Sequence, residues 1–325
     1  MMLGTHILGS GSVLPGRLVP TSEVCAKAYP HRTPQQLEER TGIASRWWAH
    51  PGTTRAEVSA QALDKALAQA KLPAGKLERI IYVDSTGGDR RLPATSNAVA
   101  EALGLEGSCD CIDLNNACVG FLSAMDWAAR CTATGLGPVA VVTTELWSHV
   151  IDPSERRTYA VFGDASVATI FGPARGNSGV VASWLRNDGR LQGSVSCRHA
   201  GSTCVPEFVR FQVSGSQIGE EATDAIVRSM HEVLDRAAIT FDEVRWVLPH
   251  QPNGRMLTTI LERIGLDPSR TLPLVREVGS VGAASVPLAL DRLIERGDLN
   301  AGDLVLLSAV GAGIGFGSIL YRAGE

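Results

Sequence analysis

Cys118 has the sequence context of a nucleophile. It follows the apolar segment Cys111–Leu114 and an Asn-Asn-Ala turn, and small residues at helical spacing follow it. A thiol at the start of a helix lies near unpaired backbone N–H groups and the positive end of the helix dipole. Both are expected to lower its pKa from about 8.5 towards neutrality and so activate it. The alternative is a small buried apolar side chain, which is the usual fate of a free cysteine.

His250 is the second residue suited to chemistry. It ends the apolar segment VRWVLP and precedes Gln-Pro-Asn. The carboxyl end of a strand faces the crevice where α/β sheets bind ligands, so this imidazole could act as a base or donate a hydrogen bond to a thioester carbonyl. The alternative is a histidine satisfied within its own turn. The Gly-rich segment Gly311–Gly317 has no helix and strand after it, which favours an oxyanion hole over a dinucleotide site.

Alternating apolar strands and helical patterns predict an α/β protein that would position these residues. The predicted strands are Ile7–Gly9, Arg79–Val83, Cys111–Leu114, Val139–Thr143, Ser166–Ile170, Val244–Leu248 and Leu304–Ser308. The predicted helices are Ala56–Ala70, Pro93–Leu103, Cys118–Cys131, Glu220–Ala237, Arg255–Ile264 and Ala283–Glu295.

The chain divides into two similar halves. The order of small-residue helix, glycine turn and buried strand that begins at Ala117 recurs at Gly282, 165 positions later. The Gly-, Ser- and Arg-rich stretch Gly172–Ser202 has the composition of a connection. We therefore expect an N-terminal half, residues 1–172, with the cysteine and a C-terminal half, residues 173–325, with the histidine.

The composition is that of an ordinary globular protein and excludes several classes of function. The 325 residues are 44% hydrophobic and 20% charged, enough for one large or two medium domains. A net charge of −4 argues against binding nucleic acid by bulk charge. The sequence has neither a membrane span nor the basic start of a signal peptide. Seven cysteines without paired spacing favour a reducing compartment, so we expect a cytoplasmic protein.

No metal site is expected either. Cys109 and Cys111 form a C-x-C pair, but no second pair of thiols or histidines follows at zinc-binding spacing. We interpret them as alternate residues of one strand.

Eight segments resemble the β-ketoacyl-acyl-carrier-protein synthase III family, which are thiolase-fold enzymes, in the same order and at the same spacing. They are GSGSVLP near the start, ERTGI (Glu39–Ile43), LPATSN (Leu92–Asn97), DLNNACVGF (Asp113–Phe121), DPSERRTYAVFGDAS (Asp152–Ser166), PHQPN (Pro249–Asn253), VGSVGAASVPLAL (Val278–Leu290) and VGAGIGFGS (Val310–Ser318). The resemblance implies two βαβαβαββ halves in an αβαβα five-layered sandwich, a homodimer and an acyl-cysteine intermediate.

The resemblance also implies roles for single residues. Cys118 is then the nucleophile and His250 the catalytic histidine, and the backbone N–H groups of Cys118 and Ala312 form the oxyanion hole. Arg40 and Arg156 fall where the family lines its pantetheine channel with basic residues. A solvated surface charge is the alternative for both arginines.

Two further positions are considered. Asn253, three residues after His250, is a candidate phosphopantetheine-binding residue and a candidate substitute for the family's catalytic Asn, with capping of the following helix as the favoured alternative. Leu92 falls where the family has a bulky gatekeeper that crosses the dimer interface into the partner's acyl pocket, with an ordinary core leucine as the alternative. Residues Gly189 to Phe208 are expected to help line the acyl pocket.

Ser280 is the main departure from the family pattern. The family has a catalytic Asn there, which with the histidine donates hydrogen bonds to the malonyl thioester carbonyl and stabilises the enolate formed as carbon dioxide leaves. A Ser hydroxyl reaches less far than an Asn amide. Loss of such a donor typically costs about 100- to 1000-fold in rate. Acyl transfer through Cys118 forms no enolate and needs only the thiol, the histidine and the oxyanion hole.

We therefore expect an acyltransferase that loads an acyl group from coenzyme A onto Cys118 and passes it to a carrier-protein phosphopantetheine thiol or another nucleophile. Relatives with this departure prime type II polyketide assembly with unusual starters, and Leu92 leaves room for an aryl or branched acyl group. Coenzyme A would be a substrate, and no cofactor is implied. The alternatives are a condensing enzyme in which Ser280 replaces the Asn, and a non-catalytic partner subunit, which the presence of Cys118 and His250 disfavours.

Overall fold

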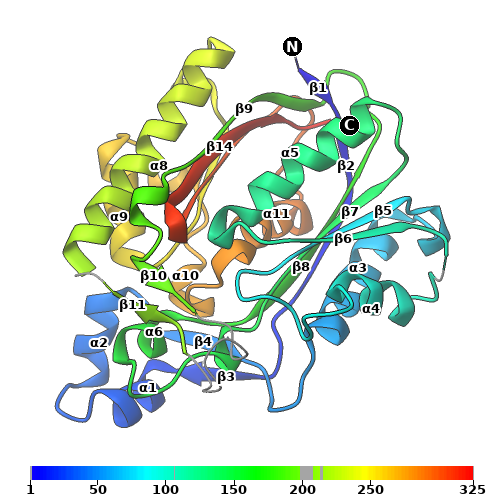
Figure 1. The fold of residues 1–325 in the computed structure, drawn as a ribbon. Helices are drawn as coiled ribbons and strands as arrows, with labels where there is room; N and C mark the ends of the chain where they lie inside the picture. The colour runs from blue at the N-terminus through cyan, green and yellow to red at the C-terminus, as the bar shows by residue number, and fades with distance from the viewer. Residues whose placement is uncertain (1, 106, 198–207, 213–214, 325) are drawn as a thin grey trace.

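Two five-stranded sheets form the core of the computed structural model (Figure 1), which describes residues 2–105, 107–197, 208–212 and 215–324. The first sheet has the order β2-β8-β7-β5-β6. Its strands are β2 (His6–Val13), β5 (Arg79–Val83), β6 (Asp110–Leu114), β7 (Val139–Glu145) and β8 (Ala165–Gly172). β5 pairs in parallel with both β6 and β7, so the carboxyl ends of these three strands meet at one edge.

The second sheet has the order β1-β9-β14-β13-β12. Its strands are β1 (Leu3–Gly4), β9 (Gly179–Asn187), β12 (Trp246–Pro249), β13 (Leu304–Gly311) and β14 (Gly315–Arg322). Its strand order repeats that of the first sheet with one difference. The chain forms no strand between the end of β12 and the start of β13 in the fully described stretch 246–311. The N-terminal β1 instead pairs with β9 at the opposite edge.

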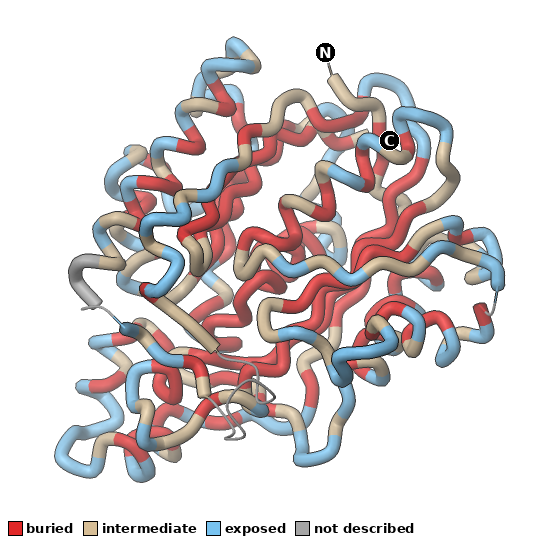
Figure 2. The backbone as a smooth tube through the Cα atoms, in the orientation of Figure 1, coloured by how far each residue is buried: buried red, intermediate tan, exposed pale blue. Residues whose placement is uncertain are grey.

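Helices complete a five-layered sandwich of the thiolase type (Figure 1). Helices α3 (Arg55–Ala70) and α4 (Thr95–Ala102) cover the outer face of the first sheet, and α8 (Gly215–Ala237) and α9 (Gly254–Arg263) cover that of the second. The central layer holds α5 (Gly120–Ala133) and α11 (Ser285–Arg296). Side chains of both helices join both sheets in one buried cluster. The segments that carry it are coloured as buried in Figure 2.

The expected duplication is present in the local structure. The segment from Ala117 folds as a 3₁₀ turn, then α5 and β7, and the segment from Gly282 folds as a 3₁₀ turn, then α11 and β13. Both strands are almost fully buried, as expected for strands covered by helices on both faces. The two helix starts face each other, since a Cβ on Gly120 would lie 3.9 Å from the Ala283 Cβ.

A smaller group of elements lies beside the sandwich (Figure 1). Its members are β3 (Arg17–Pro20), α1 (Thr21–Ala28), α2 (Pro34–Thr41), β4 (Ser45–Trp48), α6 (Arg156–Val161), β10 (Val195–Ser196), β11 (Arg210–Phe211) and α10 (Val275–Val278). A capping box fixes the start of α2, where Thr33 accepts from the backbone of Gln36.

One part of the sequence interpretation is corrected by the structure. The stretch Gly172–Ser202 is not only a connection, because its first half forms β9 in the second sheet. The Gly-rich C-terminal segment turns briefly and then continues as β14. No helix within the described ranges has both the length and the apolar character that a membrane crossing requires.

Candidate active site

One cavity of about 530 Å³ lies where the carboxyl ends of β5, β6 and β12 meet the smaller group of elements. It brings together most of the residues singled out from the sequence. They are Cys118, His250, Ser280, Ala312, Arg40 and Asn253. The two halves of the chain thus supply opposite walls, with the cysteine from the first half and the histidine from the second.

Cys118 occupies a strained turn directly after β6. It lies in the middle of the 3₁₀ turn Ala117–Val119, one turn ahead of α5, and Ala117 before it has a φ of +44°. A non-glycine residue in the left-handed region is uncommon and costs about 1–3 kcal/mol, so the surrounding structure must hold it there. Cys118, directly after this strained residue, lines the cavity.

The backbone of Gly311 packs directly against the nucleophile. A Cβ at this position would lie 2.8 Å from the Cys118 nitrogen and 3.2 Å from the Cys118 Cβ. Only glycine therefore allows the strand end to approach so closely. The next residue, Ala312, lines the cavity too, so Cys118 and Ala312, the two residues expected to form an oxyanion hole, lie on neighbouring segments of the cavity wall.

The expected activation of the thiol by its helix is not what the structure shows. Burial raises the pKa of Cys118 above its ordinary value, and the nearby Glu145 carboxylate raises it further. The sequence could not reveal this, because desolvation depends on segments far away in the chain. The resting thiol is therefore protonated at neutral pH, and its proton must leave during the reaction.

His250 is uncharged, so a ring nitrogen is free to accept a proton, although the burial that keeps it uncharged also makes the imidazole a weak base. Its backbone N–H donates to the Ser308 carbonyl at 2.7 Å, which fixes the residue at the end of β12. Burial lowers the pKa of the imidazole to about 3. Nδ1 is buried and has no hydrogen-bond partner among the described residues. No carboxylate therefore supports this histidine from behind, in contrast to a Ser-His-Asp triad.

Ser280 lies on the cavity wall with its backbone held on both sides. Its N–H donates to the Val161 carbonyl at 2.7 Å, and its carbonyl accepts from the Gly163 N–H at 3.0 Å. Gly279 before it has a φ of +73°, and a Cβ there would lie 2.9 Å from the Arg46 Cβ. The backbone at position 280 is therefore fixed by its neighbours, and Ser280 lines the cavity.

Basic residues surround the cavity, with one change from the expected set. Arg40 lines it from α2 and Arg255 from the first turn of α9, but Arg156 does not line it and its neighbour Arg157 does. On α6 the lining residues are 157, 160 and 161, which is the i, i+3, i+4 face of a helix. Arg156 lies about 100° around that helix from this face.

Asn253 has the structural role that was considered as its alternative. Its side chain accepts a hydrogen bond from the Met256 N–H at 2.9 Å and caps α9. The same residue also borders the cavity. Capping orients the first turn of α9, so Arg255 faces the cavity mouth.

Aromatic and apolar side chains form the inner wall. Trp147 and Phe162 stack at 4.2 Å with an interplanar angle of 15°, and both line the cavity. Leu191 and Val195 line it from the 189–208 segment, of which residues 198–207 lie outside the described part of the chain. Leu92 is 85% exposed and borders a separate surface hollow, so it is no core leucine and does not reach this chain's own cavity.

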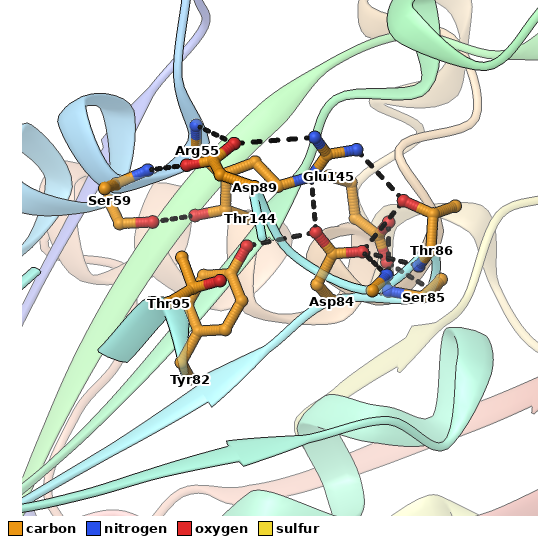
Figure 3. Close-up of polar contacts among 12 residues, drawn as sticks. Arg55, Ser59, Tyr82, Asp84, Ser85, Thr86, Asp89, Thr95, Thr144 and Glu145 are labelled. Carbon is orange, nitrogen blue, oxygen red and sulfur yellow. Dashed lines mark hydrogen bonds and ion pairs between the residues drawn. The ribbon is translucent and has the colours of Figure 1, made fainter. Parts of the chain in front are cut away.

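Sequence reasoning missed a buried polar network behind the thiol (Figure 3). Glu145 accepts a hydrogen bond from the Ser85 hydroxyl at 2.5 Å. The next residue back, Asp84, pairs with the Arg55 guanidinium at 2.5 Å. Ser85 and Thr86 also line the cavity. The available signal was a carboxylate at the end of the otherwise uncharged buried strand VAVVTTE.

Comparisons with known proteins agree with this geometry. The family models for the 3-oxoacyl-[acyl-carrier-protein] synthase III and for its C-terminal part match residues 112–189 and 234–323. The chain is 31% identical to the β-ketoacyl-[acyl-carrier-protein] synthase III of Cereibacter sphaeroides over 328 residues, which is 99% of this chain and the whole relative. The chain belongs to the β-ketoacyl-acyl-carrier-protein synthase III family. The synthase of Erythrobacter litoralis is 32% identical over 99% of this chain and all of its own.

Solved structures of this synthase family share the fold over the whole chain. The synthase III of Aquifex aeolicus superposes with a TM-score of 0.90 at 28% identity, over 98% of this chain and 100% of its own. The priming β-ketosynthase of the R1128 polyketide pathway superposes with a TM-score of 0.91 at 28% identity, over 100% and 97%. The thiolase fold expected from the sequence is thereby confirmed.

Proposed function

We propose that this enzyme is an acyltransferase that moves an acyl group from coenzyme A, through an acyl-Cys118 intermediate, to a carrier-protein phosphopantetheine thiol or another nucleophile. The acyl group is an aryl or other unusual starter, and no decarboxylative condensation takes place. The observation that carries the proposal is Ser280, which lies on the wall of the cavity shared by Cys118 and His250. Decarboxylation needs two strong side-chain hydrogen-bond donors at the thioester carbonyl. His250 supplies one of them, and the short Ser280 hydroxyl stands in the place of the second.

The proposed reaction uses the groups that the cavity retains. The Cys118 thiol gives its proton to His250 and attacks the thioester carbonyl, whose oxyanion the two backbone N–H groups receive. The bond from carbon to the coenzyme A sulfur breaks, and that sulfur takes the proton from His250. The acceptor thiol then gives its proton to His250 and attacks the acyl-Cys118 carbonyl. The bond to the Cys118 sulfur breaks, and that sulfur takes the proton back from His250. Each step needs an uncharged histidine at the start, which agrees with the lowered pKa of His250.

The cavity also supports the proposed substrates. Arg40, Arg157 and Arg255 suit the phosphates of coenzyme A and of a phosphopantetheine arm. The stacked pair Trp147 and Phe162 gives the inner end a flat apolar wall suited to an aryl group. We further propose a homodimer in which the exposed Leu92 reaches the partner's pocket, and a cytoplasmic enzyme without a bound cofactor.

A decarboxylative condensing enzyme is the second candidate. The names of the relatives at 31–32% identity favour it. In that case Ser280 would replace the usual Asn as hydrogen-bond donor.

Intact-protein mass spectrometry tests the proposal. The purified enzyme is incubated with a panel of acyl-coenzyme A thioesters and then with a holo carrier protein. We expect one acyl adduct on wild type, none on Cys118→Ala, and transfer of the unchanged acyl mass to the carrier protein. An unaltered adduct on Cys118→Ala would contradict the assignment of the nucleophile. An adduct that transfers only after addition of two carbons from malonyl-carrier protein would support the condensing enzyme instead.

A further inference from the structure

Glu145 is a fully buried carboxyl next to the nucleophile that the proposed reaction does not use. It ends β7 and is 0% exposed. It lies close enough to Cys118 for its charge to raise the pKa of that thiol. A buried carboxylate is costly unless its charge is compensated or it takes up a proton.

The hydrogen bonds to Glu145 come from uncharged donors on two different cavity segments. The Ser85 hydroxyl donates at 2.5 Å, with a longer bond of 3.4 Å from the Ser85 N–H. The Ala283 N–H donates at 3.0 Å. Ser85 lines the cavity after β5, and Ala283 lies three residues after Ser280. One carboxyl thus ties the wall beside the thiol to the turn that follows Ser280.

Gly282 lets the turn approach this carboxyl closely. Its φ is +54°, and a Cβ there would lie 2.9 Å from Glu145 Oε1 and 2.7 Å from Trp147 Nε1. Trp147 stacks on Phe162, which forms a β-bridge with Ser280. The carboxyl therefore lies close to three segments next to the cavity, those that contain Ser85, Trp147 and Ala283.

The surroundings of Glu145 favour its uncharged form. Burial raises its pKa to about 8, and the charge of Asp84 contributes in the same direction. The titratable groups that face it are Asp84 and Tyr82 from the end of β5 and Cys118 from the turn after β6. Arg55 is committed to Asp84 at 2.5 Å. At neutral pH the carboxyl therefore places no negative charge beside the thiol.

We propose that Glu145 is a positioning residue of the thiol site, which anchors Ser85 and the turn after Ser280 through its hydrogen bonds to Ser85 and Ala283. Loss of its proton places a negative charge beside Cys118 and opposes formation of the thiolate. This inference rests on the proposed function only for its consequence in acyl transfer, since it concerns the reactivity of the thiol itself. A role only as a cap for α11 predicts no effect on that reactivity.

The test compares Glu145→Gln with wild type between pH 6 and pH 9.5. The readout is the rate of Cys118 alkylation by iodoacetamide, followed by peptide mass spectrometry. We expect similar rates at pH 6 and a variant-to-wild-type ratio that rises about tenfold through pH 8, because a shift of one unit in the thiol pKa changes the thiolate fraction about tenfold. A ratio that stays constant across the range would overturn the proposal.

Two further variants keep the test decisive. Ser85→Ala removes a hydrogen bond that lowers the pKa of Glu145. The pH at which the alkylation rate falls behind that of Glu145→Gln should therefore be higher in Ser85→Ala than in wild type. Asp164→Asn is a matched control, since burial raises the pKa of that carboxyl to about 6 and its partners are Ala49 and Ser148. It should leave the alkylation ratio flat, and a rise equal to that of Glu145→Gln would also overturn the proposal.

Acylation by acyl-coenzyme A is measured on the same variants. Glu145→Ala leaves both donors unpartnered and should lower the maximal acylation rate with little change in KM, whereas Glu145→Gln should restore most of it. If alkylation depends on Glu145 as expected but no variant or wild type forms an acyl adduct, the proposed function fails and the positioning role stands. If acyl transfer occurs but the alkylation ratio stays constant with pH, the positioning role of Glu145 fails and the proposed function stands.

Discussion

Replacing Ser280 with Asn should restore the missing donor for decarboxylation. The backbone of residue 280 is held by the Val161 carbonyl and the Gly163 N–H at 2.7 and 3.0 Å, so the new side chain starts from the same place. It would extend into the cavity that His250 also lines. An amide N–H there reaches farther than the hydroxyl that it replaces.

The expected gain follows from the value of one oxyanion donor. Such a donor is worth about 100- to 1000-fold in rate, or roughly 3–4 kcal/mol of transition-state stabilisation. The larger side chain at a position only 2% exposed is expected to cost at most about 1–3 kcal/mol of stability. The variant should therefore remain folded, and melting curves show whether it does.

The assay measures carbon dioxide released from malonyl-carrier protein by wild type, Ser280→Asn and the matched control Ser280→Ala. We expect release from Ser280→Asn to exceed that of wild type by about 100-fold or more, with acyl loading of Cys118 changed by less than about threefold. Ser280→Ala should not exceed wild type. Equal release from wild type and a folded Ser280→Asn would refute the argument that residue 280 limits decarboxylation.

Three further predictions follow from the site. Arg40→Ala should raise KM about tenfold or more for acyl-coenzyme A but leave it unchanged for an acyl-N-acetylcysteamine, which lacks the phosphates; equal effects on both would contradict phosphate binding. Gly311→Ala should slow acyl loading at least tenfold, because its Cβ would lie 2.8 Å from the Cys118 nitrogen, and a normal rate would be inconsistent with the close approach. Burial raises the pKa of Glu145 from 4.5 to about 8, so its contribution to the free energy of unfolding should fall as pH rises over that range. Denaturant unfolding of Glu145→Gln should lack this loss, on the order of 5 kcal/mol.

The strands and helices could be predicted wherever the apolar pattern was strong. The strand Arg79–Val83 was predicted to the residue, and β7 and β13 extend a few residues beyond the prediction. The strand β9 was missed because its Gly, Ser and Arg residues resemble a connection and only part of it is buried. The family resemblance implied a further strand between β12 and β13, and the structure forms none there. The pairing of the N-terminal β1 with β9 could not be predicted, because the two strands are far apart in the sequence.

The site was predictable in its residues but not in its electrostatics. Cys118 and His250 share a cavity, as their positions after strands indicate, and Ser280, which the family resemblance placed with them, lines the same cavity. The pKa of Cys118 was predicted with the wrong sign because burial comes from the other half of the chain. Arg157 rather than Arg156 lines the cavity because the phase of α6 is set by its packing, which a six-residue helix does not reveal in its sequence.

One reaction tests the central claim most directly. The wild-type enzyme, loaded with an acyl group on Cys118, is offered equal amounts of holo carrier protein and malonyl-carrier protein, and both products are measured by intact-protein mass spectrometry. Our account predicts that nearly all acyl groups appear unchanged on the holo carrier protein, without release of carbon dioxide. A product two carbons longer as the main species, with an equal amount of carbon dioxide, would contradict it.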